Sequence, residues 1–432
     1  MSILIKDSLI LTQDKDRSIR RGDIYIEDDI ISEVSDRVST EAEYVITGKM
    51  VMPGLINTHT HLPMTLMRGY GDDLTLEEWL TTRIWPVEKK LNGEMVETGT
   101  RLALLEMIST GTTTCSDMYF FENEIAGACR DMGMRCFAGF SIIDFDTPEM
   151  KKEMLLPECE KFIRRWKDDG LVAPVVAPHS TYSCSPETLQ KSAELAGKYG
   201  TMLHTHCSET RTEVYDVVER YGCRPVEQLE KNGMLTEKTV LAHCGWITKE
   251  EVRQIAHAGA CVSHNPVSNM KLATGGFTPL PELFDENACV TLGTDGAASN
   301  NKLDMFETMK FAALIHKHYR WDAQIVTAQQ TLDMATVNAA SYLGMDAGSI
   351  EEGKKADLIC LDTDMPNLAP MHNPVSHAVY AASGFNVSST IIDGKPLMLE
   401  REFPYFDDRK ILEDAERAKD ELVGREQGRN GF

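Results

Sequence analysis

Several features that mark other protein classes are missing from this chain of 432 residues. No apolar run approaches the roughly 20 residues needed to cross a bilayer, which argues against a membrane-spanning helix. The opening stretch MSILIKDSLILTQDKD has acids among its apolar residues and no small-residue cleavage site, so we expect no signal peptide. The 11 cysteines are odd in number and never in C-x-x-C spacing, a pattern typical of reduced thiols in a cytoplasmic chain.

Basic residues are scarce relative to acidic ones. The chain has 44 Lys and Arg against 67 Asp and Glu, a formal net charge of −23 at pH 7. Such a surface repels phosphate backbones and anionic lipids, although an acidic surface also serves solubility alone. We therefore expect no nucleic acid and no membrane as partner, and a small neutral or zwitterionic substrate.

Both ends of the chain carry short strand patterns. Residues 1–50 alternate apolar and polar side chains in runs such as DIYIEDDIISEVSD, and the pattern returns within 346–403 in GKKADLICLD and SSTIIDGKPL. This pattern predicts hairpins of a small antiparallel sheet. Because the termini of a barrel lie close together, the two ends predict one composite β-sandwich domain. Residues 404–432 are highly charged and predict a helical tail, solvated or packed on another subunit.

The middle of the chain, residues 51–345, has a different rhythm. Nearly continuous apolar runs, each followed by a helical stretch, indicate a parallel sheet buried on both faces. Eight such units over about 290 residues predict a (β/α)8 TIM barrel of the α/β class. The eight runs are VMPGLINTHTH, TTTCSDM, RCFAGFSIID, VAPVVAPHS, TMLHTHCSE, TVLAHCGWI, ACVSHNPVSN and CVTLGTDGAAS.

Unusual polar residues fall at the carboxyl ends of these runs, which form the catalytic face of a barrel. His59 and His61 end the first run, and their i, i+2 spacing places both imidazoles on one side of a strand. H-x-H alone is a weak signal, because hydrogen-bonded core histidines are common. His206, His243 and Asp295 end later runs, and a charged Asp in an apolar run is costly unless it is paired or bound to metal. Together they predict a metal site.

Further polar residues need separate interpretations. Glu209 follows His206 by three residues, where it would move protons beside the metal, or else pair with Arg211. His204 lies two residues before His206, so we expect a hydrogen-bonded core histidine. His264 is expected to shape a loop, and three more histidines in helical segments are expected at the surface, namely His257, His316 and His318.

The chain resembles the amidohydrolase superfamily in four motifs, and the resemblance covers nearly the whole chain. These are PGLINTHTH, HCSE, LAHC and LGTDGAASN, which contain His59 and His61, His206 and Glu209, His243, and Asp295. The match is closest to the branch of 5′-methylthioadenosine/S-adenosylhomocysteine deaminases and related 5′-deoxyadenosine deaminases. Binuclear members of the superfamily carry a carboxylated Lys at the end of the fourth strand, where this chain has His179 and no Lys.

The resemblance implies a single metal ion and a deaminase mechanism. One Zn²⁺ per subunit would be held by His59, His61, His206 and Asp295, with Fe²⁺ and Mn²⁺ as alternatives. The metal activates a water, Asp295 accepts the proton of that water, His243 positions it, and Glu209 protonates N1 of an adenine ring. Such relatives are often homo-oligomers, among them tetramers.

The resemblance also assigns the substrate contacts. It makes Glu88 the acceptor for the ribose 2′- and 3′-hydroxyls, although Glu88 beside Lys89 and Lys90 would otherwise pass for an exposed helix charge. It places His179 on the N3 side of the purine. Trp79, Trp85 and Tyr70 would wall the pocket or pack in the core; they lie with Glu88 in one insert.

The substrate range follows from one departure from the family. Some relatives clamp the carboxylate of homocysteine with an Arg after the third strand, where this chain has FSIIDFDTPEMKKEM, with Asp144 and Asp146 and no Arg. We therefore expect 5′-deoxyadenosine and 5′-methylthioadenosine ahead of S-adenosylhomocysteine and adenosine, in salvage of S-adenosylmethionine by-products. The alternatives are a deaminase or chlorohydrolase of a free base such as guanine, cytosine or a triazine, a binuclear cyclic-amide hydrolase, and an inactive barrel.

Overall fold

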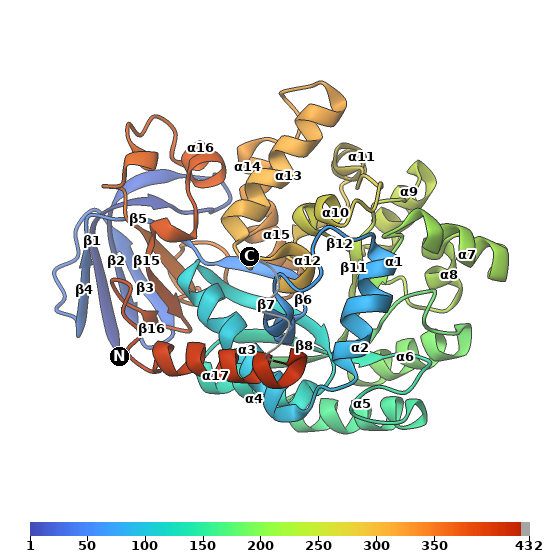
Figure 1. The fold of residues 1–432 in the computed structure, drawn as a ribbon. Helices are drawn as coiled ribbons and strands as arrows, with labels where there is room; N and C mark the ends of the chain where they lie inside the picture. Colours follow the sequence, from blue (N-terminus) through green and yellow to red (C-terminus); the bar gives the residue numbers. More distant parts are fainter. Residues whose placement is uncertain (425–432) are drawn as a thin grey trace.

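The computed structural model describes residues 1–424 and contains two sheets (Figure 1). One of them confirms the predicted barrel, because its eight parallel strands follow one another in sequence order around the sheet. Their side chains are buried on both faces, as the continuous apolar runs required. The strands are β6 (Leu55–Thr60), β7 (Thr112–Tyr119), β8 (Arg135–Ile142), β9 (Val172–Pro178), β10 (Met202–Cys207), β11 (Thr239–His243), β12 (Cys261–His264) and β13 (Cys289–Leu292).

The barrel closes between its first and last strands. The amide of Asp295 donates to the carbonyl oxygen of His59 at 2.9 Å. Deeper in the barrel, the hydroxyl of Thr58 donates to the carbonyl oxygen of Leu292 at 3.0 Å. These bonds bring the residues that follow β13 directly against the end of β6.

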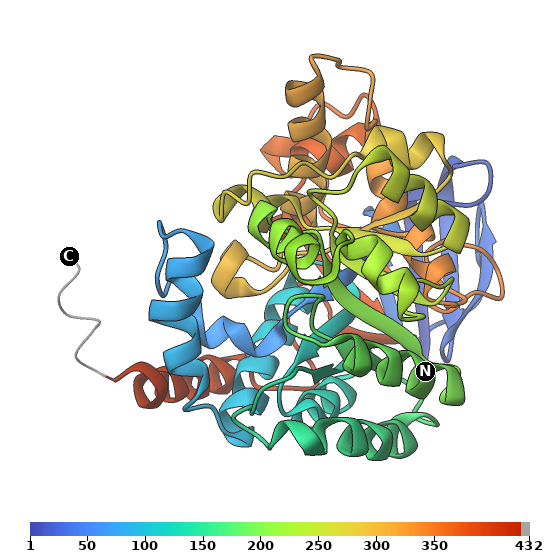
Figure 2. The ribbon, with the colours of Figure 1, turned by 90° about the vertical axis from the view of Figure 1, so that its right-hand side faces the viewer.

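Helices cover the outside of the barrel (Figure 2). A typical one, α6 (Pro186–Tyr199), begins at Ser185, whose hydroxyl accepts from the Thr188 amide, and ends at Gly200 in the left-handed region. The others are α3 (Gly93–Ser109), α4 (Glu122–Met132), α5 (Lys152–Trp166), α7 (Arg211–Tyr221), α8 (Pro225–Lys231), α9 (Lys249–Ala258), α10 (Pro266–Lys271), α11 (Leu280–Asp285), α12 (Ala297–Asn300), α13 (Met305–Arg320), α14 (Ala328–Met334) and α15 (Val337–Tyr342).

An insert between β6 and α3 rises over the carboxyl ends of the strands. It contains four short helical turns, of which η2 has π-helical hydrogen bonding. They are η1 (Leu62–Met67), α1 (Leu76–Trp79), η2 (Leu80–Ile84) and α2 (Trp85–Glu88).

The second sheet joins both ends of the chain, as predicted, and has a hydrophobic core of its own. Its strands are not all antiparallel, because β4 and β5 run parallel to β1, which corrects the expectation of hairpins alone. By its hydrogen bonds β5 belongs to this sheet and β6 to the barrel, with Gly54 between them. The strands are β1 (Ser2–Leu11), β2 (Ile19–Glu27), β3 (Ile30–Ser35), β4 (Tyr44–Thr47), β5 (Met50–Pro53), β14 (Leu358–Leu361), β15 (Val387–Ile392) and β16 (Lys395–Met398).

The charged tail forms α17 (Asp408–Val423), which lies along α3 of the same chain (Figure 2). Its apolar stripe, Ile411, Ala415 and Leu422, is buried there. Residues 425–432 of the predicted tail lie outside the described part. Short turns connect β14 with β15, namely η3 (Pro366–Leu368), α16 (Pro374–Ser376), η4 (His377–Ala381) and η5 (Gly384–Asn386). No helix in residues 1–424 is both long and apolar enough to cross a membrane.

Candidate metal centre

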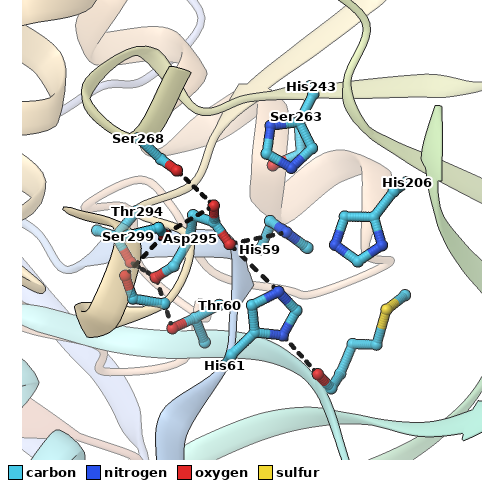
Figure 3. A network of polar contacts seen from close by, with 12 residues as sticks. His59, Thr60, His61, His206, His243, Ser263, Ser268, Thr294, Asp295 and Ser299 are labelled. Carbon is cyan, nitrogen blue, oxygen red and sulfur yellow. Dashed lines mark hydrogen bonds and ion pairs between the residues drawn. The ribbon is translucent and has the colours of Figure 1, made fainter. Parts of the chain in front are cut away.

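The carboxyl ends of the barrel strands surround a cavity of about 470 Å³. His61, His206, His243 and Asp295 line one side of it, beneath the insert that follows β6. His59 is wholly buried behind them, and its ring centroid lies 4.9 Å from that of His61 and 4.9 Å from that of His206. The structure thus brings the four predicted metal ligands together with His243, the residue predicted to position the water (Figure 3).

Contacts at Nδ1 orient the rings of His59 and His61. Nδ1 of His59 lies 3.0 Å from Nε2 of His204, whose own Nδ1 lies 3.3 Å from the Ser116 hydroxyl. Nδ1 of His61 donates to the carbonyl oxygen of Met118 at 2.5 Å (Figure 3). A ring whose Nδ1 is occupied in this way presents Nε2 as the free lone pair, which is how metal-binding histidines are usually oriented.

The rings of His206 and His243 are also oriented by contacts at Nδ1. Nδ1 of His206 donates to the carbonyl oxygen of His179 at 2.8 Å. Nδ1 of His243 lies 2.8 Å from the side-chain oxygen of Asn269. Nitrogen atoms of His59, His206 and His243 lie within 4.8 Å of one another. His59 therefore belongs to two neighbouring groups of possible ligand atoms, one with His206 and His243 and one with His61 and Asp295.

The carboxylate of Asp295, just after β13 and next to the end of β6, completes the cluster. Its Oδ2 accepts hydrogen bonds from Ser268 at 2.5 Å and Ser299 at 3.0 Å. Its Oδ1 lies 3.4 Å from Nε2 of His59 and 3.2 Å from Nε2 of His61 (Figure 3). The two serines thus occupy one carboxylate oxygen and leave the other for the histidine cluster.

The electrostatics of the cluster fit a cation. Burial lowers the pKa of His59 to about 4, and its Nε2 is a buried atom with no hydrogen-bond partner among the described residues. Burial opposes the charged form of His61, but the hydrogen bond and charge of Asp295 raise the pKa of that ring to about 9. The carboxylate therefore draws a proton into the cluster where a divalent metal ion would supply the positive charge.

Backbone geometry allows the close approach of strands at the site. A Cβ on Gly293 would lie 2.8 Å from Cβ of His59, so only glycine fits between β6 and β13 there. His243 has φ of 75° and Asp295 has φ of 63°, both in the left-handed region that non-glycine residues seldom occupy. Such conformations concentrate at functional sites, where the surrounding structure holds them.

Glu209 lines the same cavity, at the turn after β10. Burial raises the pKa of its carboxyl, and Asp295 adds to the rise. Glu213 fixes the turn, because its side chain accepts from the amides of Ser208 at 2.9 Å and Glu209 at 2.7 Å. Arg211 instead donates to the hydroxyl of Tyr215, which leaves Glu209 free of the alternative ion pair. A buried carboxyl with a raised pKa suits proton donation near neutral pH.

Glu88, the last residue of α2, lines the same cavity. It is 9% exposed and accepts a hydrogen bond from the Tyr119 hydroxyl at 2.6 Å, so it is not an exposed helix charge. Burial raises the pKa of this carboxyl, while the bond from Tyr119 opposes the rise. His179 also lines the cavity, and Nδ1 of its ring lies 2.9 Å from the Ser183 hydroxyl. Burial lowers the pKa of His179 to about 3, so its ring is neutral.

The aromatic residues of the insert divide into two groups. Trp79 and Trp85 line the cavity, together with Leu76 and Leu80. Tyr70 is not among the lining residues and lies under the Arg83 guanidinium, 5.9 Å from the charged carbon to the ring centroid.

Three of the remaining histidines, His204, His264 and His316, are buried, and His264, expected to shape a loop, is the last residue of β12. His204 is buried and hydrogen-bonded, as predicted, and its partner is His59. His316 was expected at the surface, but it is fully buried, with Nε2 3.4 Å from Nε2 of His264. It sits on the inner face of α13, where Phe277 covers its ring at 4.3 Å between centroids. His257 and His318 are exposed, as expected.

Several functional residues were missed by sequence reasoning. Asp117 lies in the apolar run TTTCSDM and accepts from the Leu62 amide at 2.6 Å, directly after His61. Like Asp295, Asp117 is a charged residue within an apolar run, which by itself indicates a functional position. Tyr119, Asn269 and the two serines on Asp295 carried no such signal, because their roles depend on contacts between distant strands.

The fold and the site define a metal-dependent hydrolase of the (β/α)8 class, with its divalent metal ion held at the mouth of the barrel. Residues 50–397 match the model of the amidohydrolase family, and the chain belongs to that family. It is 44% identical to 5′-deoxyadenosine deaminase of Methanothermobacter thermautotrophicus, over 94% of this chain and 96% of the relative.

Two further comparisons agree with this assignment. The chain is 40% identical to 5-methylthioadenosine/S-adenosylhomocysteine deaminase of Aquifex aeolicus, over 98% of both chains. A crystal structure of an adenosine deaminase from Xanthomonas campestris with bound zinc superposes with a TM-score of 0.94 at 34% identity. That superposition covers 97% of this chain and 98% of the other.

Proposed function

We propose that this enzyme deaminates adenosine nucleosides at C6, giving the inosine analogue and ammonia. The preferred substrates are 5′-deoxyadenosine and 5′-methylthioadenosine, with S-adenosylhomocysteine and adenosine as slower ones, in salvage of S-adenosylmethionine by-products. One arrangement carries the proposal: a histidine–aspartate cluster and the proton carrier Glu209 line one cavity with Glu88, a buried carboxylate suited to ribose hydroxyls. The names of the two relatives support the same substrate class.

The metal ligands in this proposal are His59, His61, His206 and Asp295, and the ion is a single Zn²⁺, with Fe²⁺ and Mn²⁺ as alternatives. Such an ion supplies Lewis acidity and lowers the pKa of a bound water toward neutrality. A single ion is supported because no lysine lines the cavity in the described chain.

The side chains of the cavity then divide the proton transfers. The Asp295 carboxylate, held by two serines, accepts the proton of the attacking water, and His243 orients that water toward C6. Glu209, whose pKa burial raises, gives a proton to N1 of the purine, which makes the ring a better electron sink. Asp295 then passes its proton to the amine at C6, and the C6–N bond breaks with release of ammonia. The hydroxyl at C6 returns a proton to Glu209 as the carbonyl of the inosine analogue forms.

Two further residues of the cavity select the nucleoside. Glu88 accepts hydrogen bonds from the 2′- and 3′-hydroxyls of ribose, and His179 contacts the purine on its N3 side. A ribose-binding carboxylate has no purpose with a free base, which disfavours guanine, cytosine and triazine substrates. No Lys or Arg of the described chain lines this cavity, so the carboxylate of S-adenosylhomocysteine finds no guanidinium clamp there.

The decisive experiment measures ammonia release from adenosine analogues with metal-reconstituted enzyme. Glu209→Gln should retain the metal but lower turnover by roughly 10²- to 10⁴-fold, the usual contribution of a general acid. Glu219→Gln, at an exposed position on α7, is the matched control and should leave turnover unchanged. An active Glu209→Gln enzyme would refute the assigned role, and metal counting per subunit tests the single ion.

We further propose that the enzyme is cytoplasmic and a homo-oligomer, with a tetramer as the first assembly to test. Exposed aromatic side chains on the described surface support a subunit contact, since Trp321 is 94% exposed and Tyr319 is 61% exposed. Light scattering of the purified enzyme gives the subunit number directly.

A further inference from the structure

Three buried cysteines form a cluster between the barrel wall and α4. Cys115 on β7 and Cys136 on β8 are paired residues of these neighbouring strands. Side chains alternate along a strand and Ser116 meets His204 inside the barrel, so Cys115 points outward to the helix layer. Cys129, in the last turn of α4, reaches the same place from the helix. The three Sγ atoms lie within 4.8 Å of one another, and all three residues are free cysteines.

The spacing of these thiols suits a single central atom. Sulfur atoms that bind one metal at about 2.3 Å lie roughly 4 Å apart in a trigonal arrangement, so small side-chain rotations would bring all three to one centre. Hydrogen bonds from Cys129 and Cys136 lower the pKa of the Cys115 thiol, while burial, Asp117 and Glu122 oppose the change. Thiolates are soft ligands that select thiophilic ions.

The surroundings of the cluster restrict the charge of the ion. All three cysteines belong to the large hydrophobic core around the barrel, and the acids Asp117 and Glu122 disfavour further negative charge there. A buried net charge without a partner is costly. Cu⁺ or Zn²⁺ with three thiolates would leave a net negative charge, whereas a trivalent ion with three thiolates is neutral.

We propose that Cys115, Cys129 and Cys136 form a binding site for trivalent arsenic, separate from the histidine–aspartate cluster. When arsenous acid, As(OH)₃, reacts there, three As–S bonds form and three As–O bonds break. The three thiol protons leave with the three hydroxides as water, and no electron is transferred. Arg130 and Asp131 expose the outer face of α4, so a local opening of this surface helix admits the small neutral acid.

The test incubates the zinc-loaded enzyme with arsenite and a phosphine reductant, removes the excess, and measures arsenic and zinc per subunit by mass spectrometry. The wild type should bind one arsenic and keep its zinc, and Cys129→Ala should lose the arsenic. Cys360→Ala is the matched control, because this buried cysteine lies on β14 outside the cluster; it should bind arsenic like the wild type. No arsenic on the wild type, or equal uptake by Cys129→Ala, would overturn the site.

Thermal unfolding provides a second readout with a second variant. An ion that binds the folded chain stabilises it, so arsenite should raise the Tm of the wild type and of Cys360→Ala but not that of Cys136→Ala. No cysteine of the described chain lines the metal-centre cavity, so all these variants should keep wild-type deaminase activity and zinc, which shows that they are folded. An equal rise in Tm for Cys136→Ala would refute the site.

Discussion

The hydroxyl of Tyr119 offers a test of the ribose end of the cavity with a change of one atom. It donates to Oε1 of Glu88 at 2.6 Å, and no other described residue donates to this carboxylate. Tyr119→Phe removes that donor and keeps the ring, whose centroid lies 5.1 Å from that of Phe120. Both partners are buried, so water does not replace the lost bond at full strength.

The size of the effect follows from the charge on the acceptor. A hydrogen bond to a charged group contributes about 1.5–3 kcal/mol, which predicts a fall in kcat/KM of roughly 10- to 150-fold. The sign of the pH effect is also fixed. Burial raises the pKa of Glu88 and the bond from Tyr119 opposes that rise, so its loss raises the pKa further. Because the proposed ribose contact needs the ionised carboxylate, the acid limb of activity should move to higher pH.

The assay is kcat/KM for 5′-deoxyadenosine between pH 5 and 9, with metal content measured on the same samples. Tyr342→Phe is the matched control, because it loses a bond of 2.7 Å to the carbonyl oxygen of Thr239, outside the cavity. It should leave the acid limb in place. A uniform loss in Tyr119→Phe with an unmoved acid limb, or an equal loss with a 2′,3′-dideoxynucleoside, would refute the reasoning.

Three further changes test the support of the site. His204→Leu removes the partner of His59, and metal affinity should fall about 10- to 100-fold in competition with a chelator; unchanged affinity contradicts the role. Gly293→Ala places a Cβ 2.8 Å from Cβ of His59 and should cost about 1–3 kcal/mol in urea unfolding, which wild-type stability would disprove. Burial lowers the pKa of His316 to about 2 and of His264 to about 3, from 6.5, so the unfolded chain binds protons that the folded one does not and stability falls below pH 6.5. Between pH 7.5 and 5.5, the free energy of unfolding of His316→Leu should fall by about 1.4 kcal/mol less per pH unit below 6.5 than that of the wild type. An equal fall in the two proteins would contradict this account.

The barrel could be predicted because each of its strands is buried on both faces. Continuous apolar runs such as VAPVVAP leave no polar face to alternate, and all eight runs became strands of one sheet. The strand order of the second sheet, formed by the two chain ends, was harder to predict. Its strands were visible, but the parallel pairing of β4 and β5 with β1 depends on which edges the barrel leaves available, and no local pattern encodes that.

The candidate ligands could be found from position alone, since strand ends converge in any closed barrel. His59 and His61 follow from the period of two along a strand. Glu88 could not be found in this way, because only the resemblance distinguished it from its lysine neighbours. His316 was misplaced because an amphipathic helix can bury a polar residue on its inner face when that residue has a partner, here His264.

Closure of the barrel and retention of the ion depend on the same few atoms. The amide of Asp295 is bonded to the carbonyl of His59, while the side chains of both residues point to the common centre. An ion bound at that centre would therefore cross-link β6 and β13 where the barrel closes. Removal of the ion should destabilise the pairing of β6 with β13 more than the pairing of the other barrel strands. Faster amide hydrogen exchange along β6 and β13 would show this local opening.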